Sequence, residues 1–353
     1  MYLPGTYIPA LLMLITCMIC WGSWANTQKL AKSFRFELFY WDYIIGMVLT
    51  SLAFGLTLGN TGELSNGLPF MASLSQAAAG KLGLAFLSGI IFNAANVLLV
   101  AAIAVAGLAV AFPVGIGLAL IIGTIGNYLV NPNGNPILLF GGMTLVAAAI
   151  VLDAFAYRVL AKRKSAHNSS KGGGSAERPA PAQPAASVGL GIGLSLACGV
   201  LMGLFYPFFA KSISGAGNLT PYSGFFVFSI GCAFSTVPVI GYFMRRPVSG
   251  KPVKAAEYFR APGDWHVWGV LGGIIWSLGA MFNFMVGAKP GLVGPAVSYS
   301  LGQGATLVSA IWGVFIWREF QGAGPKATLL LILMFACFLS GLGSIAIAPL
   351  VNG

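Results

Sequence analysis

The amino-acid sequence predicts an all-helical integral membrane protein with ten transmembrane helices arranged as two inverted five-helix repeats. Of its 353 residues, 57% are hydrophobic and 8% are charged, against about 25% charged residues in soluble globular proteins. The mean hydropathy is +0.85. Residues 82–152 contain no Asp, Glu, Lys or Arg over 71 positions. That length is enough for about three helical crossings of a hydrocarbon layer roughly 30 Å thick.

An internal repeat supports the two-half architecture. Two short motifs recur 184 positions apart with the same spacing: GII at 89–91 and 273–275, and GL at 107–108 and 291–292. The expected apolar spans are, in order, 7–26, 40–59, 82–105, 107–129, 136–157, 188–210, 222–243, 266–288, 291–317 and 326–348. Because five is odd, a second set of five helices inserts upside down relative to the first, as in many transporters that bind substrate near the membrane midplane.

The first span lacks a basic leader and a small-residue cleavage site, so it is expected to remain as a helix. The predicted organisation is an N-terminal repeat at 1–157, a cytoplasmic flexible linker at 158–187 and a C-terminal repeat at 188–353. The linker is basic, then rich in Gly and Ser, then rich in Ala and Pro. Its glycines lack the order of a phosphate-binding loop, and no metal-ligand cluster appears, so no cofactor is expected.

The basic residues predict the orientation in the membrane. Sixteen of the nineteen Lys and Arg residues fall after odd-numbered spans, and Lys81, Lys211 and Lys289 fall after even-numbered ones. By the positive-inside rule the odd loops are cytoplasmic and both termini face outward. The net charge of +11 is therefore explained by basic loops that orient the chain in the membrane, and no nucleic-acid partner is expected. The expected location is the cell's inner (plasma) membrane, where membrane lipid surrounds the protein.

Polar groups inside apolar spans are the candidate site residues, because each costs free energy unless a partner satisfies it. Asp42, near the start of the second span, is a candidate proton carrier; the alternative is an interfacial pair with Lys29 or Lys32. Pro113 and Pro295 are expected to interrupt paired spans and to free backbone carbonyls there. Sodium held by the carbonyls near Pro113 is the alternative coupling ion.

Uncharged amides and aromatics complete the candidate site. The amides are Asn93, Asn96, Asn127, Asn283 and Gln303. They suit a neutral polar solute, and their alternative role is to join helices by hydrogen bonds. The aromatics are Trp21, Trp24, Tyr206, Trp276, Tyr299 and Trp312, whose faces stack on planar heterocycles or sugars. Trp276 and Asn283 are seven residues apart and are expected to share a helix face.

Several groups of residues form a pattern over nearly the whole chain except the linker. They are Trp21-Gly22-Ser23-Trp24, Phe39, Asp42-Tyr43, Gly55 through Gly59 and Gly62, Gly89 through Asn96, Gly107-Leu108-Ala109-Val110, Gly123-Thr124, Asn127-Tyr128, Gly272-Gly273 through Phe282, Trp312-Gly313-Val314 and Glu319. In order and spacing, this pattern resembles that of the plant ureide permeases.

The resemblance implies a drug/metabolite transporter superfamily member, beside the glucose/ribose uptake and L-rhamnose/proton symporter families. Ureide permeases move allantoin, uracil and related compounds together with protons. Trp21, Trp24, Asp42, Asn96 and Asn127 take the family's motif positions. Plant members carry a nucleotide-binding-like motif in the central loop that this chain lacks, which favours a bacterial relative with a substrate shifted towards sugars.

The resulting expectation is import of a small neutral polar solute, a ureide or nucleobase, by proton symport. A sugar symporter and a metabolite or drug exporter are the alternatives within the superfamily. The exporter would turn Asn96, Asn283 and Gln303 towards lipid. A membrane-embedded enzyme is disfavoured because the spans lack a His/Asp cluster or a Ser-centred triad. The oligomeric state is left open, with a homodimer allowed.

Overall fold

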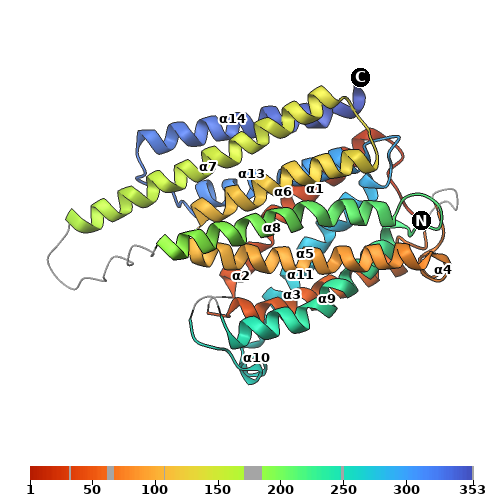
Figure 1. The fold of residues 1–353 in the computed structure, drawn as a ribbon, viewed down its shortest axis with the longest axis horizontal. Coiled ribbons are helices and arrows are strands. Elements are labelled where there is room, and N and C mark those ends of the chain that lie inside the picture. Colours follow the sequence, from red (N-terminus) through yellow and green to blue (C-terminus); the bar gives the residue numbers. More distant parts are fainter. Residues whose placement is uncertain (32, 62–66, 107, 171–184, 248–249, 352–353) are drawn as a thin grey trace.

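The computed structural model describes residues 1–31, 33–61, 67–106, 108–170, 185–247 and 250–351. Within these ranges every regular element is a helix, and the long helices run side by side in one bundle (Figure 1). Gly62 and Gly107 of the sequence pattern, Lys32 and residues 171–184 of the predicted linker lie outside the described residues. Nine helical stretches of the described chain are long and apolar enough to span a membrane. The protein is therefore a multi-pass integral membrane protein.

The long helices match the expected spans in order. They are α1 Tyr7–Ser23, α3 Phe36–Leu56, α5 Ala79–Ala106, α6 Leu108–Val130, α7 Pro136–Ser170, α8 Ala185–Ser212, α9 Pro221–Arg245, α11 Gly263–Gly287 and α14 Pro325–Ile347. The expected ninth span is divided into α12 Gly294–Gly302, α13 Ala305–Ile311 and a π-helical turn Trp312–Ile316. Short helices α2 Ala25–Leu30, α4 Phe70–Gln76 and α10 Ala255–Arg260 lie between the long ones.

Two boundaries differ from the sequence expectation. Helix α7 continues through Ser170, well into the predicted linker, because the basic residues after 157 are good helix formers. In the ninth span the expected interruption at Pro295 is absent, since Pro295 occupies the first turn of α12, where a missing N–H costs nothing. The break falls instead at Gln303 and Gly304, between α12 and α13. Helix α6 continues through position 113.

Side-chain capping groups begin two of the long helices, as lipid offers no partner for an exposed backbone N–H. At α9, Thr220 and Ser223 exchange hydrogen bonds in a capping box: the Thr220 amide donates to Ser223 Oγ at 3.0 Å, and the Ser223 amide donates to Thr220 Oγ1 at 3.3 Å. At α7, Asn135 Oδ1 accepts from the amides of Ile137 and Leu138. These side chains set where the two helices begin.

Helices α3 and α11 cross at glycines. A Cβ on Gly273 would overlap the carbonyl oxygen of Tyr43, and a Cβ on Gly46 would overlap that of Val270. Close backbone approach of this kind is how membrane helices associate, because lipid supplies little hydrophobic drive between them. The crossing brings Tyr43 and the residues around it against the middle of α11.

Helices α5 and α9 cross in the same way. A Cβ on Gly89 would overlap the carbonyl oxygen of Phe228, and a Cβ on Gly231 would overlap that of Phe86. The Cys232 thiol also donates to the Gly89 carbonyl at 3.2 Å. The two crossings place α3, α5, α9 and α11 around the centre of the bundle.

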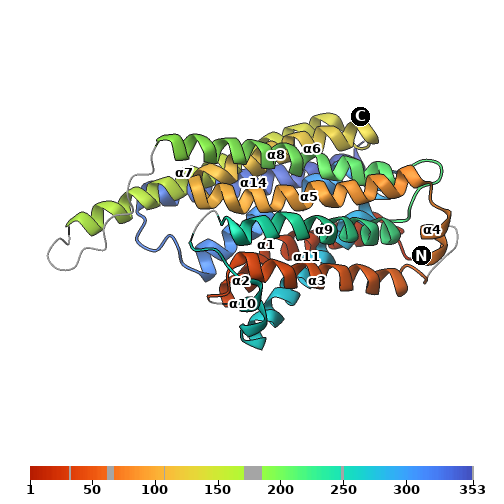
Figure 2. The ribbon, with the colours of Figure 1, turned by 60° about the horizontal axis from the view of Figure 1, so that its bottom comes forward.

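The bundle has two distinct ends. Both chain termini lie at one end, which we call the terminal end (Figures 1 and 2). There the Tyr7 hydroxyl donates to the Ala346 carbonyl, and the Asn135 amide donates to Ala348 O at 2.8 Å. The opposite end, which we call the α10 end, gathers the loops after α2, α9 and α13. Arg35 Nη1 donates to Lys251 O at 3.0 Å and joins two of those loops.

Candidate functional site

An aromatic layer lies where the central helices meet. Trp276 on α11 stacks on Trp21 of α1, with ring centroids 5.8 Å apart and planes 12° apart, and Trp21 Nε1 donates to the Trp276 carbonyl at 3.2 Å. Phe92 on α5 lies 4.6 Å from Trp276, and Phe228 on α9 lies 6.2 Å from it. The indole of Trp276 is therefore surrounded by rings from three other helices, α1 and α5 of the N-terminal half and α9 of the C-terminal half.

Tyr43 extends this layer and was missed as a site residue in the sequence. Its ring lies 4.9 Å from Trp24, 5.3 Å from Tyr40 and 6.4 Å from Trp276. Its hydroxyl is buried and has no hydrogen-bond partner among the described residues. A buried hydroxyl without a partner costs free energy, so this atom is the clearest candidate for a substrate contact. A tyrosine inside an apolar span was the available sequence signal.

An uncharged network lies on the α10 side of the layer. The Tyr40 hydroxyl donates to Asn93 Oδ1 at 2.8 Å and accepts from Asn96 Nδ2 at 3.0 Å. Asn93 Nδ2 donates to Ser235 Oγ at 2.9 Å, so both ends of the Asn93 amide are engaged. Asn96, which is 6% exposed, has only its nitrogen bonded within the described chain, and its carboxamide oxygen remains available. This network joins α3, α5 and α9.

A second uncharged network lies on the terminal side. Asn283 Nδ2 donates to Ser298 O at 2.9 Å, and Ser298 Oγ donates to Asn283 Oδ1 at 3.0 Å. The Tyr206 hydroxyl donates to Asn283 O at 3.3 Å. Asn283 follows Trp276 by two helical turns, so it lies about 10 Å further along α11. The two amide networks thus flank the aromatic layer along the bundle.

The other predicted residues lie elsewhere. Asn127 Nδ2 donates to Gly123 O of its own helix, and its buried Oδ1 has no partner in the described chain. The Tyr299 hydroxyl donates to Ala119 O at 3.0 Å and so ties α12 to α6. Gln303 is 9% exposed at the break between α12 and α13, and its side chain makes no hydrogen bond to the described residues.

Asp42 is held by residues from the other half of the sequence. His266 Nδ1 lies 2.7 Å from Asp42 Oδ2, and the Tyr258 hydroxyl donates to Asp42 Oδ1 at 2.5 Å. Burial raises the pKa of Tyr258, and the adjacent carboxylate raises it further, so the phenol stays a donor. Asp42 is 2% exposed. The expected alternative pairing with Lys29 is not formed, since Lys29 pairs with Glu319 instead.

The chemistry of the site is that of a neutral ligand. The aromatic layer and both amide networks consist of uncharged side chains. The Asp42–His266 pair lies outside them, with Asp42 directly before Tyr43 on α3 and His266 near the start of α11. Ring faces provide stacking, and the Tyr43 hydroxyl and the Asn96 oxygen provide hydrogen bonds. A planar or ring-shaped solute with N–H and C=O groups fits these functions.

Comparison with known proteins identifies relatives over nearly the whole chain. The sequence model of the family described as ureide permease matches residues 39–180 and 174–348. Ureide permease 2 of Arabidopsis thaliana is 23% identical, and the alignment covers 96% of this chain and 97% of that protein. Ureide permease 4 of the same plant is 24% identical, with 96% and 97% covered.

A solved crystal structure has the same fold. It superimposes with a TM-score of 0.55 at 16% sequence identity, and the match covers 94% of this chain and 95% of the other. At that identity the likeness concerns the course of the backbone alone.

Proposed function

The chain belongs to the ureide permease family, and on this premise we propose that it is a secondary transporter that imports a small neutral solute, a ureide or nucleobase. The observation that carries the proposal is the buried, unpartnered Tyr43 hydroxyl within the aromatic layer, flanked by uncharged amide networks. Allantoin and uracil are planar or ring-shaped and rich in N–H and C=O groups. Such a solute stacks on tryptophan and exchanges hydrogen bonds with a phenol and carboxamides.

Individual roles follow from the free hydrogen-bonding capacity. Trp21, Trp24 and Trp276 provide the stacking faces. The Tyr43 hydroxyl and the Asn96 oxygen contact the substrate, since both lack a partner in the described chain. Asn93 instead holds Tyr40 in place and positions Asn96 only through Tyr40, because its own amide is engaged by Tyr40 and Ser235.

The remaining predicted residues have other roles in this proposal. Asn283 and Tyr206 hold the terminal-side network, and Gln303 contacts the substrate from the helix break. Tyr299 supports α6 rather than the substrate, since its hydroxyl is bonded to Ala119 O. Asn127 keeps a substrate role, because its buried Oδ1 has no partner in the described chain. The exporter alternative loses its support, as Asn96, Asn283 and Gln303 are 6%, 0% and 9% exposed and do not face lipid. A sugar is not favoured by the family membership.

Proton symport is proposed through Asp42. Protonation of the carboxylate removes the charge that holds His266, and so loosens a contact between α3 and α11. In this way, binding of a proton to Asp42 changes how tightly α3 of the N-terminal half packs against α11 of the C-terminal half. Sodium is the alternative coupling ion, and uptake with each ion gradient separates the two.

We propose that the architecture is ten helices in two inverted repeats, residues 1–157 and 188–353, joined by 158–187. The reciprocal glycine crossings support it, because equivalent members are 184 or 185 positions apart: Tyr43 and Phe228, Gly46 and Gly231, Phe86 and Val270, Gly89 and Gly273. Termini at one end also support an even number of crossings.

The basic loops at the opposite end support a cytoplasmic α10 end. In this orientation the termini face outward from the plasma (inner) membrane, and lipid surrounds the bundle. A homodimer is compatible with this topology.

The test is uptake into proteoliposomes of labelled allantoin, uracil, L-rhamnose and glucose, each with and without an inward proton gradient. We expect gradient-driven uptake of allantoin or uracil and none of the two sugars. Uptake of a sugar alone would contradict the proposed substrate class. Uptake that follows a sodium gradient and ignores protons would contradict the proposed role of Asp42.

A further inference from the structure

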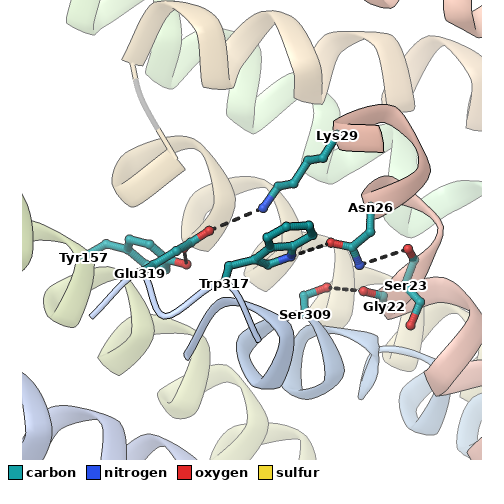
Figure 3. Close-up of polar contacts among 8 residues, drawn as sticks. All are labelled: Gly22, Ser23, Asn26, Lys29, Tyr157, Ser309, Trp317 and Glu319. Atoms are coloured by element: carbon teal, nitrogen blue, oxygen red, sulfur yellow. Dashed lines mark hydrogen bonds and ion pairs between the residues drawn. The ribbon is translucent and has the colours of Figure 1, made fainter. Parts of the chain in front are cut away.

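The α10 end is closed by polar contacts between the α1–α2 segment and the segment from Ser309 to Glu319. At the outer edge, Lys29 Nζ lies 3.3 Å from Glu319 Oε1 and 4.8 Å above the ring of Trp317 (Figure 3). Trp317 Nε1 donates to Asn26 Oδ1 at 2.8 Å. These contacts join α2 to the loop that follows α13.

Two further contacts lie deeper, at the end of α1. Trp312 Nε1 donates to Ser23 Oγ at 2.8 Å, and Ser309 Oγ donates to Gly22 O at 3.1 Å (Figure 3 shows the second). We call these four cross-contacts, from Gly22 to Lys29, the polar ladder. Each of them joins the N-terminal part of the chain to the C-terminal part.

The C-terminal side of the ladder is anchored but irregular. The Tyr157 hydroxyl of α7 donates to Glu319 Oε2 at 2.6 Å, and so holds the carboxylate by the oxygen that Lys29 does not contact. The backbone between the rungs forms a π-helical turn at Trp312–Ile316, and Arg318 has a φ of 52°. Such irregular backbone stores strain and is common at moving functional segments.

The two ends of the bundle are closed with unequal strength. The Lys29 and Glu319 side chains are 52% and 30% exposed, and ion pairs of that exposure are weak. On the terminal side, the rings of Phe209 and Phe284 stack at 3.8 Å and both are fully buried. Segments with exposed polar contacts open at lower free energy than segments with buried apolar ones. The ladder is therefore the easier closure to open.

We propose that the polar ladder is the gate at the α10 end of the transport path, with the Lys29–Glu319 ion pair as its latch. The inference rests on the proposed transport function. Trp24 lies between the rungs at Ser23 and Asn26, and its ring packs against that of Tyr43, with the centroids 4.9 Å apart. Movement of the α1–α2 segment away from Glu319 withdraws Trp24 and uncovers the Tyr43 hydroxyl. Gate opening and access to the candidate site are thus the same movement.

The test measures opening without any substrate. Cys20 lies one turn below Trp24 and is 7% exposed, so a water-soluble thiol reagent reaches it only when the gate opens. The protein carries Cys337→Ala, since Cys337 is the half-buried cysteine among five that are otherwise buried. Modification of Cys20 is followed by peptide mass spectrometry in purified, detergent-solubilised full-length chain.

We expect Lys29→Ala and Glu319→Gln each to speed modification of Cys20 about two- to fivefold, the range for loss of an exposed ion pair. Lys29→Arg keeps the charge and the wild-type rate. The exchanged pair Lys29→Glu with Glu319→Lys returns towards that rate. The matched control is Glu37→Gln, which removes an acid from the 2.7 Å pair with Arg35 at the start of α3 and leaves the rate unchanged.

Unchanged rates in both single variants would overturn the proposal. The proposal would also be overturned if Glu37→Gln sped Cys20 modification equally, or if Lys29→Arg sped it, because either result would indicate that the whole fold had become less stable. Failure of the wild-type protein to transport ureides or nucleobases would contradict the proposed function and leave the labelling result as it stands. The two hypotheses are therefore tested separately.

Discussion

Replacement of Tyr43 by phenylalanine tests the candidate site through two opposite effects. The wild-type hydroxyl is buried without a partner in the described chain, so the free protein bears its desolvation cost. Removal of such a group relieves about 1–3 kcal/mol, and we expect the variant to melt at a higher temperature than the wild type. If the substrate hydrogen-bonds to this hydroxyl, the variant loses about 0.5–1.5 kcal/mol of binding, or roughly two- to tenfold in dissociation constant.

The assay compares thermal unfolding and substrate binding in the same detergent, with allantoin and uracil as ligands. The matched control is Tyr40→Phe, the same change one turn away. The Tyr40 hydroxyl is bonded to both Asn93 and Asn96, so its loss is expected to lower stability by about 1–3 kcal/mol. A Tyr43→Phe variant that is no more stable than the wild type, and binds both ligands equally well, would refute the assignment of Tyr43.

Three other predictions concern coupling, the network and the helix crossings. Asp42→Asn should keep substrate binding but abolish accumulation against a gradient in proteoliposomes; full accumulation would remove Asp42 from coupling. Asn93→Ala should lower the free energy of unfolding by about 1–3 kcal/mol, because the Ser235 and Tyr40 hydroxyls each lose a hydrogen-bond partner. An unchanged melting temperature would contradict that network. Gly273→Ala should destabilise by about 1–3 kcal/mol because its Cβ meets the Tyr43 carbonyl, whereas Gly291→Ala, with open space around it, should be neutral.

The buried amides could be identified from the sequence, because the free-energy cost of an unsatisfied carboxamide depends only on the apolar span that contains it. Asn93, Asn96 and Asn283 stand in apolar spans, where a carboxamide must find a partner, and all three are buried in the bundle. The same reasoning predicted that Trp276 and Asn283 share a helix face, and both residues lie on α11. It did not single out Tyr43, since an unpartnered hydroxyl is recognised only when its whole surroundings are known.

Partners across the bundle were beyond sequence reasoning. Asp42 was expected to act alone or to pair with nearby Lys29 or Lys32, yet its partner His266 is 224 positions away. Lys29 pairs with Glu319, 290 positions away. Sequence spacing carries no information on contacts of that range, because they depend on how distant helices cross. Of the glycines that set those crossings, Gly89 and Gly273 were visible as a repeat, whereas Gly46, Gly231 and all the carbonyl partners were not.

The sequence by itself determined that this protein is a multi-pass membrane protein, and its long apolar stretches determined where most helices lie. Those properties are local, because in lipid a chain must satisfy its backbone hydrogen bonds within each helix. Only the tertiary structure decided that Trp276 stacks on Trp21, that Tyr43 lacks a partner and that Glu319 meets Lys29. Each of these depends on close packing between helices that are far apart in the chain, and glycine crossings bring those helices together.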